Sequence, residues 1–331
     1  MTGASRSDVV SNRYTLGALR RLFRERPIVP LTGLLAILVA MTELTRPGIV
    51  SPDWVEGVVR LSIPLAILAG CQTIAMLTGG IDLSVGAVAS MSGFLVSTLV
   101  NGPGVEAGIV AALVAAAIAG LVTGLGVGVF RVHPLIMTLA MSLVVLGLAN
   151  VWQIQMVQTG VGVPEGLRQV GSESFLDIFP NSLFVFVPVA IVLLVGLRRT
   201  GYGRLLFAVG DNPVAARLSG ARSWQVLTLL YVISAVMAAI AGFLYAGLTN
   251  VASVTLVASE VLPSVAAAVI GGTSILGGRG GYGGTIVGAL ILTVVASLLS
   301  SLGYPEAVRQ VLFGSIIIAV AAAYTRVTAE G

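Results

Sequence analysis

Apolar residues fill most of this chain in long runs, separated by short breaks of polar residues, glycine and proline. A run of about 17 to 25 mostly apolar residues can cross the hydrocarbon core of a bilayer as an α-helix. The pattern predicts an all-α, polytopic membrane protein with about ten crossings, or eight or nine if the short and glycine-broken runs do not cross. The expected spans are residues 28–44, 57–77, 83–100, 107–130, 134–153, 183–197, 225–246, 260–276, 284–302 and 308–325.

The charges predict the orientation. Only 10% of residues are charged, and all eighteen basic residues are arginine. If the N-terminus is cytoplasmic, most arginines lie on the cytoplasmic side, and this positive-inside bias indicates that both termini are cytoplasmic. The expected organisation is a cytoplasmic tail at 1–27, one transmembrane domain at 28–326 and a tail at 327–331. The net charge of +4 then reflects membrane orientation and not a nucleic-acid surface.

The missing residue types exclude several activities. Without lysine, the chain cannot contain the GxxxxGK[ST] loop, in which a lysine reaches the terminal phosphates of ATP. One histidine, His133, and one cysteine, Cys71, cannot make a common zinc site. No nucleophile and carboxylate accompany His133 as in a catalytic triad. We therefore expect no catalytic residue, no metal and no cofactor bound by this chain, which is then not an enzyme.

An acidic residue lies between two apolar runs in the motif TGGIDLSVG at 78–86. Intramembrane carboxylates are costly and usually functional, so Asp82 is a candidate for the solute path or a helix break. The alternative is a cap, in which Asp82 accepts backbone N–H bonds near Ser84 while glycines make the turn. Both interpretations stay open. Thr78, Gly80 and Ser84 share this candidate site.

Glycines mark two further features. Gly120, Gly124 and Gly128 are spaced four apart, which favours close packing of helices. The motif IGGTSILGGRGGYGG at 270–284 suits a re-entrant or tightly turned segment buried in protein. Thr273 and Ser274 in this motif could offer hydroxyls to a polar solute, although bonds to neighbouring helix carbonyls are favoured.

The segment 198–224 is rich in arginine and lies between two expected spans. Asn212 as an N-cap, Pro213 at the first position and Gly220 after the end predict a helix at 213–219. Ala215, Ala216 and Leu218 would then form a docking surface beside the Arg217 guanidinium. The alternative is an ordinary positive-inside loop that its arginines hold at the headgroups.

Three motifs carry a family resemblance. TGGIDLSVG at 78–86, GYGRLLFAVGDNPVAARLSG at 201–220 and AAVIGGTSILGGRGGYGGTIVGALI at 267–291 together resemble the permease subunits of ribose, xylose, galactose and autoinducer-type ABC importers. The resemblance implies a fold similar to cobalamin-importer permeases, with about ten helices per subunit and two subunits around a central path. It also implies that residues 208–220 are the coupling helix, and Asp211 and Asn212 match the small or acidic residue and the asparagine that the family commonly carries before that helix. The segment GRGGYGGT departs from the shorter turn of many relatives.

The resemblance implies a permease that moves a sugar or sugar-like solute across the cytoplasmic membrane of a prokaryote. Cytoplasmic ATP-binding subunits would use ATP and magnesium, an extracytoplasmic sugar-binding protein would deliver the solute, and a second permease copy or paralogue would complete the dimer. Arg204 and Arg217 are the expected contacts with the ATPase. A branched-chain amino-acid permease and an ion-coupled secondary transporter are the alternatives. The expected polar groups of the path are Thr78, Ser84, Ser90, Asn150, Gln153 and Thr273.

Overall fold

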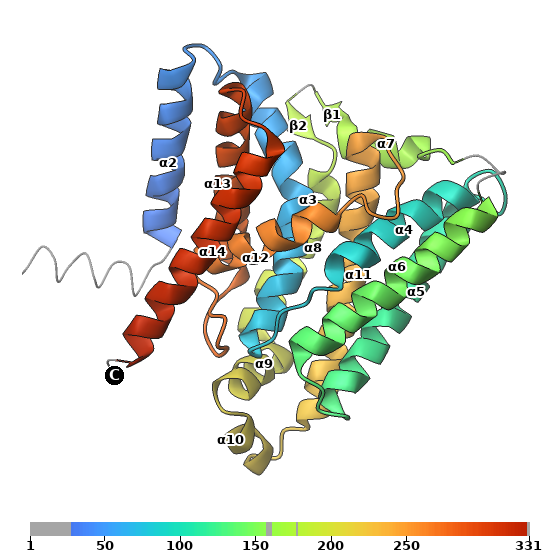
Figure 1. Cartoon of the computed structure of the whole chain (residues 1–331), viewed down its shortest axis with the longest axis vertical. Coiled ribbons are helices and arrows are strands. Elements are labelled where there is room, and N and C mark those ends of the chain that lie inside the picture. The colour runs from blue at the N-terminus through green and yellow to red at the C-terminus, as the bar shows by residue number, and fades with distance from the viewer. Residues whose placement is uncertain (1–27, 157–160, 177, 330–331) are drawn as a thin grey trace, which may run out of the picture.

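The computed structural model describes residues 28–156, 161–176 and 178–329, so the expected tail at 1–27 lies outside the described residues. The described part is mostly helical with almost no strands, as the all-α prediction requires (Figure 1). Its helices are α2 (Ile28–Thr45), α3 (Pro52–Leu77), α4 (Val85–Leu99), α5 (Val105–Gly128), α6 (Pro134–Met156), α7 (Glu165–Ser172), α8 (Leu183–Arg199), α9 (Gly201–Asp211), α10 (Pro213–Leu218), α11 (Ser223–Thr249), η1 (Ala258–Glu260), α12 (Val261–Ile270), α13 (Tyr282–Ser301) and α14 (Glu306–Ala329).

Six described helices are long and apolar enough to cross a membrane: α2, α3, α5, α6, α11 and α13. The pair α8 and α9 forms a seventh candidate that bends by 67° between the two helices. Shorter apolar helices, α4 and the segment 258–270, occupy the predicted spans 83–100 and 260–276. The predicted span 308–325 lies within α14.

Helix α3 lies at the centre of the bundle, where 83% of its most apolar 18-residue stretch is buried. Ser51 caps this helix by accepting a hydrogen bond of 3.2 Å from the Trp54 N–H, and Pro52 follows at the first helical position. Helices α11, α12 and α13 pack against α3, whereas α2 packs on the outside against α13 (Figure 1). A helix that is apolar on all sides suits this buried position.

The predicted close packing of the three spaced glycines is confirmed. All three lie on α5 against the backbone of α11. A Cβ at Gly120 would overlap the Tyr231 carbonyl oxygen, and one at Gly124 would lie 2.6 Å from the Thr228 Cα. Real Cβ atoms do not come this close, so the two helices meet at a distance that only small residues allow.

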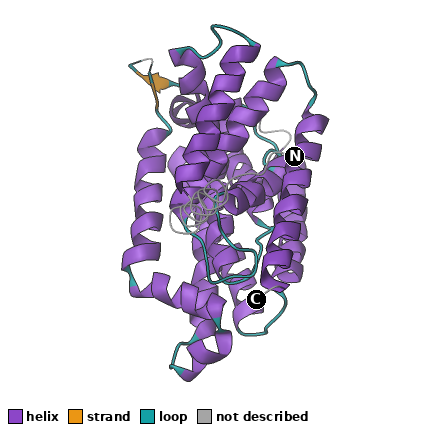
Figure 2. Cartoon of the chain, turned by 90° about the vertical axis from the view of Figure 1, so that its left-hand side faces the viewer, coloured by secondary structure: helices purple, strands orange, loops and turns teal. Residues whose placement is uncertain are grey.

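Helix α7 and a small hairpin after it were not predicted. Strands β1 (Ser174–Phe175) and β2 (Phe179–Pro180) pair in antiparallel fashion, with Ser174 opposite Pro180. The hairpin lies at the end of the molecule away from α9 and α10, close to α7 (Figures 1 and 2). It therefore belongs to the face opposite the arginine-rich segment.

Candidate functional site

The arginine-rich segment is a pair of short helices and not a loop. Helix α8 ends at Arg199, and Thr200 caps α9 by accepting a hydrogen bond of 3.1 Å from the Gly203 N–H. Asn212 has extended backbone angles, so it separates α9 from α10. Its Oδ1 accepts hydrogen bonds of 3.0 Å from the N–H groups of Val214 and Ala215. The predicted roles of Asn212 and Pro213 at the helix start are confirmed, while the single helix expected at 208–220 is wrong.

The end of α10 closes as predicted at Gly220. The N–H of Ala221 bonds to the Ala216 carbonyl and the N–H of Gly220 to the Arg217 carbonyl, each at 3.0 Å. Gly220 has a φ of +87°, so the pattern is a Schellman motif that satisfies two terminal carbonyls. The helix ends at Leu218, one residue earlier than predicted.

The outward surface of α9 and α10 differs in one position from the predicted docking surface. Leu218 is 85% exposed, and Ala215, Arg217 and Arg204 are also exposed, but Ala216 is buried and cannot contact a partner. Tyr202 fastens α9 to α11 by donating a hydrogen bond of 3.0 Å to the Val226 carbonyl. An exposed leucine of this extent beside arginines is typical of a protein-binding surface.

A cleft of about 860 Å³ separates α10 from the turn between α5 and α6. Its lining is mostly apolar but includes four basic side chains: Arg131, His133, Arg217 and Arg222. Thr78, which was predicted to lie in the solute path, also lines this cleft, and its hydroxyl donates a hydrogen bond of 2.9 Å to the Ala75 carbonyl.

The last turn of α9 meets two distant segments through backbone alone. A Cβ at Gly210 would overlap the carbonyl oxygen of Leu77, the last residue of α3. The Gly278 N–H donates a hydrogen bond of 3.0 Å to the same carbonyl. A Cβ at Gly277 would lie 2.8 Å from the Gly210 carbonyl oxygen and 3.1 Å from the Gly79 nitrogen. We call the contact of Gly210, Leu77, Gly277 and Gly278 the backbone junction.

The first segment at this junction leads into a helix break around Asp82, which is 1% exposed. Asp82 Oδ1 accepts hydrogen bonds from the Ser84 hydroxyl at 2.6 Å and the Ser84 N–H at 3.0 Å. Asp82 Oδ2 accepts a bond of 2.7 Å from the Ser234 hydroxyl on α11. Both carboxylate oxygens are therefore hydrogen-bonded, which offsets the cost of burying a charge. The capping interpretation expects Asp82 to accept a hydrogen bond at the start of α4. The backbone donor is the N–H of Ser84, one residue before the helix begins.

Side chains from α3 and α6 satisfy the backbone of the same break. Gln72 Nε2 donates a hydrogen bond of 2.8 Å to the Asp82 carbonyl, and Gln72 Oε1 accepts one of 3.2 Å from the Asp82 N–H. The Thr138 hydroxyl accepts a hydrogen bond of 3.1 Å from the Leu83 N–H and donates one of 3.1 Å to the Ile81 carbonyl. Irregular backbone inside a membrane requires such partners. Sequence reasoning missed Gln72, Thr138 and Ser234, although a glutamine within an apolar span was a visible signal.

Glycines allow the turn that precedes Asp82. Gly79 has a φ of +76°, which disfavours any residue with a Cβ. A Cβ at Gly80 would lie 3.1 Å from the Pro134 Cβ and 3.1 Å from the Tyr231 hydroxyl oxygen. The predicted turn at Gly79 and Gly80 is confirmed.

The second segment at the junction is the glycine-rich turn between α12 and α13. Gly272, Gly277, Gly278 and Gly280 all have positive φ, so the predicted tight turn is confirmed. The hydroxyls of Thr273 and Ser274 were predicted to bond to helix carbonyls, and this is wrong. Ser274 Oγ accepts a hydrogen bond of 3.2 Å from the Leu276 N–H. Thr273 Oγ1 is buried without a hydrogen-bond partner among the described residues.

Two contacts join this second break to α3. Tyr282, in the segment GRGGYGGT, begins α13 and donates a hydrogen bond of 3.0 Å to the Ala66 carbonyl. The hydroxyls of Thr73 and Thr285 lie 2.7 Å apart. Helix α3 is thus hydrogen-bonded to residues of both breaks.

The other predicted path residues lie apart from Asp82. Ser90 is buried and accepts a hydrogen bond of 2.9 Å from the Val257 N–H. Asn150 and Gln153 lie on the exposed surface of α6, and Asn150 Nδ2 donates 2.8 Å to the Leu146 carbonyl of its own helix. The structure therefore brings together Gly80, Asp82 and Ser84 but not these three residues.

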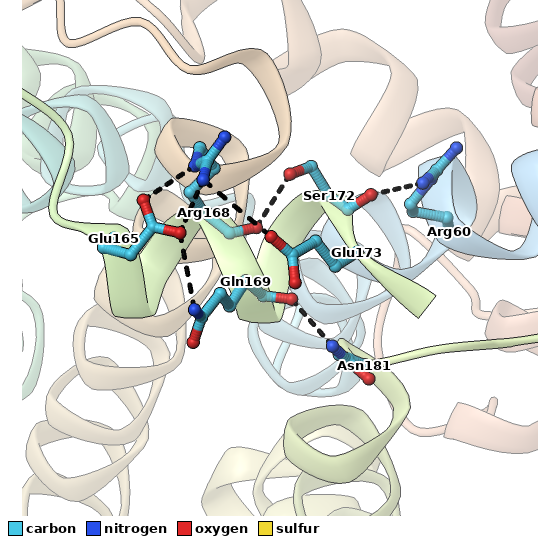
Figure 3. Close-up of polar contacts among 7 residues, drawn as sticks. All are labelled: Arg60, Glu165, Arg168, Gln169, Ser172, Glu173 and Asn181. Carbon is cyan, nitrogen blue, oxygen red and sulfur yellow. Dashed lines mark hydrogen bonds and ion pairs between the residues drawn. The ribbon is translucent and has the colours of Figure 1, made fainter. Parts of the chain in front are cut away.

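On the opposite face, α7 carries a charged cluster (Figure 3). Arg168 Nε donates a hydrogen bond of 3.0 Å to Glu165 Oε2, and Arg168 Nη2 lies 4.0 Å from Glu173 Oε1. The hydrogen bond from Arg168 lowers the pKa of the Glu165 carboxyl below its ordinary value. Arg60 of α3 donates to the Ser172 carbonyl and so holds the end of α7 (Figure 3).

The chain is similar to import permeases over nearly its whole length. It is 35% identical to the ribose import permease protein of Bacillus subtilis over 87% of this chain and 89% of that protein. It is 30% identical to the fructose import permease protein of Rhizobium meliloti over 95% of this chain and 91% of that protein. Among solved structures, none matches. The family model "Branched-chain amino acid transport system / permease component" matches residues 54–321. The chain therefore belongs to this permease family.

Proposed function

We propose that the chain is the membrane-spanning permease subunit of an ABC importer for a sugar or sugar-like solute. The observation that carries this proposal is the exposed α9–α10 pair, which is joined through the backbone junction to both helix breaks. The relatives named for ribose and fructose favour a sugar over an amino acid. The cytoplasmic membrane of a prokaryote is the expected location, with about ten crossings, both termini inside and a fold of the cobalamin-importer type.

Energy enters through separate cytoplasmic subunits, which bind ATP and magnesium. They contact Leu218, Arg217 and Arg204, and their closure displaces α10 and α9. Gly210 contacts the backbone of Leu77 and of the Gly277–Gly278 turn directly, with no flexible side chain between them. A displacement of α9 therefore moves the Leu77 carbonyl and this turn. The helices that flank both breaks then tilt as rigid bodies, and the path opens alternately to the two sides.

The solute arrives on an extracytoplasmic binding protein. The outward cluster of α7, with Glu165, Arg168 and Glu173, is the proposed contact for that protein. A second permease copy or paralogue completes the path. Asp82 organises the first break from within, either as a cap or as part of the solute path.

Proteoliposomes that contain the chain, its ATP-binding subunits and its binding protein test this function. Uptake of ribose or fructose should require ATP and should persist when proton and sodium gradients are abolished. Uptake of leucine instead of sugars would favour a branched-chain amino-acid permease. Ion-driven uptake by the chain without ATP-binding subunits would favour a secondary transporter.

A pull-down tests the coupling surface separately. The double variant Arg217→Glu with Gly220→Val reverses an exposed charge and forces a side chain into a φ of +87°. It should lose most binding to the ATP-binding subunits, whereas Arg46→Glu on the opposite face should keep it. Full binding by the double variant would refute the coupling assignment.

A further inference from the structure

A second group of polar side chains lies far from Asp82 and from the α9–α10 pair. Residues of α3, α11, η1, α12, α13 and α14 enclose a cavity of about 300 Å³. It lies beside the turn between α13 and α14, on the face opposite α9 and α10 (Figure 1). None of the path residues predicted from the sequence lines it. We call it the outer cavity.

The outer cavity is unusually rich in ionisable groups for a site among apolar helices. Glu260 and Tyr245 lie side by side on one wall, and Arg309 with its ion-pair partner Glu306 lines another. A carboxylate among apolar helices, such as Glu260, is costly and generally functional, whereas the Glu306 side chain in the first turn of α14 is exposed.

One hydrogen-bond donor in this cavity lacks an acceptor. Arg309 Nε is buried and has no hydrogen-bond partner within the described part of the chain, although its Nη2 pairs with Glu306. A buried N–H without an acceptor is unfavourable by roughly the desolvation cost of that group. Nε does not face the open volume, so an oxygen atom of a bound solute would satisfy it only after a rotation of the Arg309 side chain.

The lining indicates the chemical class of that solute. Carboxylates accept hydrogen bonds and a guanidinium donates them, so a group that does both, such as an alcohol, matches Glu260 and Arg309 together. Glu306 and Arg309 pair with each other, so the Glu260 carboxylate disfavours an anion. Leu65 and Phe313 supply an apolar wall for C–H groups. A volume of about 300 Å³ is at the lower end of the range for small-molecule sites.

We propose that the outer cavity is a binding site for one neutral, polyhydroxylated solute of monosaccharide size, held by Glu260, Arg309 and Tyr245. The site receives the solute on its way into the path. This proposal rests on the proposed function as a sugar importer and adds a defined set of contact residues.

Uptake by the complete reconstituted complex is the first test, with ribose and fructose as probes. Glu260→Gln and Arg309→Gln should each raise the KM for the transported sugar by roughly tenfold, since each removes a charge-assisted hydrogen bond. Glu106→Gln, an exposed carboxylate at the start of α5, should match the wild type. Unchanged KM in both cavity variants, in a complex whose wild type imports sugar, would overturn this proposal and leave the proposed function intact.

Thiol labelling tests the site independently of these variants. Cys71 is fully buried, so an introduced cysteine is the main reactive thiol. Ala296→Cys in the cavity wall should react with a small thiol reagent, and ribose or fructose should slow that reaction at least severalfold. Asn101→Cys, in an exposed outer loop, should react at the same rate with and without sugar.

The outcomes separate the two proposals. Protection at position 296 alone supports the outer cavity. Labelling that sugar leaves unchanged, together with ATP-dependent sugar uptake by the same complex, contradicts the cavity assignment only. Absence of sugar uptake by the wild-type complex contradicts the proposed function, and the cavity proposal fails with it.

Discussion

The Ser234 hydroxyl donates a hydrogen bond of 2.7 Å to Asp82 Oδ2, across 152 positions of sequence. The Ser84 hydroxyl donates a hydrogen bond to the other carboxylate oxygen, so Asp82 links α11 to the break before α4. Buried polar networks of this kind are stable only when every member has its partner. The link therefore sets the position of the break relative to α11.

Loss of the Ser234 hydroxyl should destabilise the protein. Ser234→Ala leaves Asp82 Oδ2 buried without a donor, at a cost of about 1–3 kcal/mol. Thermal unfolding in detergent should show a lower Tm. Ser315→Ala is the matched control, since Ser315 is exposed and bonds only to the Val311 carbonyl of its own helix. Equal Tm values for the two variants would contradict the role of Ser234.

Asp82→Asn should separate capping from a role in the path. An amide accepts hydrogen bonds through only one of its terminal atoms, so the bond from the Ser84 N–H survives only if the Ser234 hydroxyl turns to accept from the new NH2 group, and the charge that strengthens these bonds is lost. A capping role predicts lower yield and Tm with normal transport per folded molecule. A role in the path predicts reduced transport at normal yield. If yield and transport both stayed at wild-type levels, neither interpretation would survive.

Gly210→Ala should uncouple ATP hydrolysis from transport. The added Cβ overlaps the Leu77 carbonyl oxygen, so α9 must move away from the backbone junction. Reconstituted complexes should retain ATPase activity but lose most of their uptake. Gly196→Ala in α8 is the control, because a Cβ there meets nothing within 4 Å. Normal coupling in Gly210→Ala would remove the junction from the mechanism.

Asn212→Ala should weaken the attachment of the ATP-binding subunits. The substitution removes the cap that accepts from Val214 and Ala215, at a cost of about 0.5–2 kcal/mol of helix stability. Hydrogen exchange at residues 214–218 should accelerate, and the Kd for the ATP-binding subunits should rise severalfold. Asn212→Asp, which keeps an acceptor, should restore both values. Failure of aspartate to restore them would show that the cap is not the reason.

The ion pair on α7 should persist at mildly acidic pH. Arg168 lowers the pKa of Glu165 from its ordinary value of 4.5, so Glu165 stays charged above that pH and the pair weakens only below it. Glu165→Gln should therefore leave the dependence of Tm on pH unchanged between about pH 5.5 and 8. A wild-type transition within that range that Glu165→Gln abolishes would contradict this assignment.

Local signals predicted the short-range features well. Asn212, Pro213 and Gly220 predicted the start and end of α10 because capping depends on neighbouring backbone groups. Gly79 and Gly80 predicted a turn, and the glycines at 120, 124 and 128 predicted a close helix contact. Each of these rests on conformational freedom or on the absence of a Cβ, which a sequence displays directly.

Features that depend on which helices are neighbours were missed or wrong. Ala216 was assigned to the docking surface, although α10 packs with this residue inward. Asn150 and Gln153 were grouped with Asp82, although α6 carries them on its exposed side. Hydropathy could not separate these cases, because lipid-facing and buried surfaces of a membrane helix are equally apolar.

From composition and local patterns alone, this is a helical membrane protein without a phosphate loop of its own, with a helix-capping pattern in its arginine-rich segment. The packing of the helices was needed to show that Ser234, Gln72 and Thr138 complete the Asp82 break, that Gly210 contacts Leu77 and that Glu260 and Arg309 line one cavity. Hydropathy and capping are local, whereas these contacts join segments that become neighbours only when the helices pack.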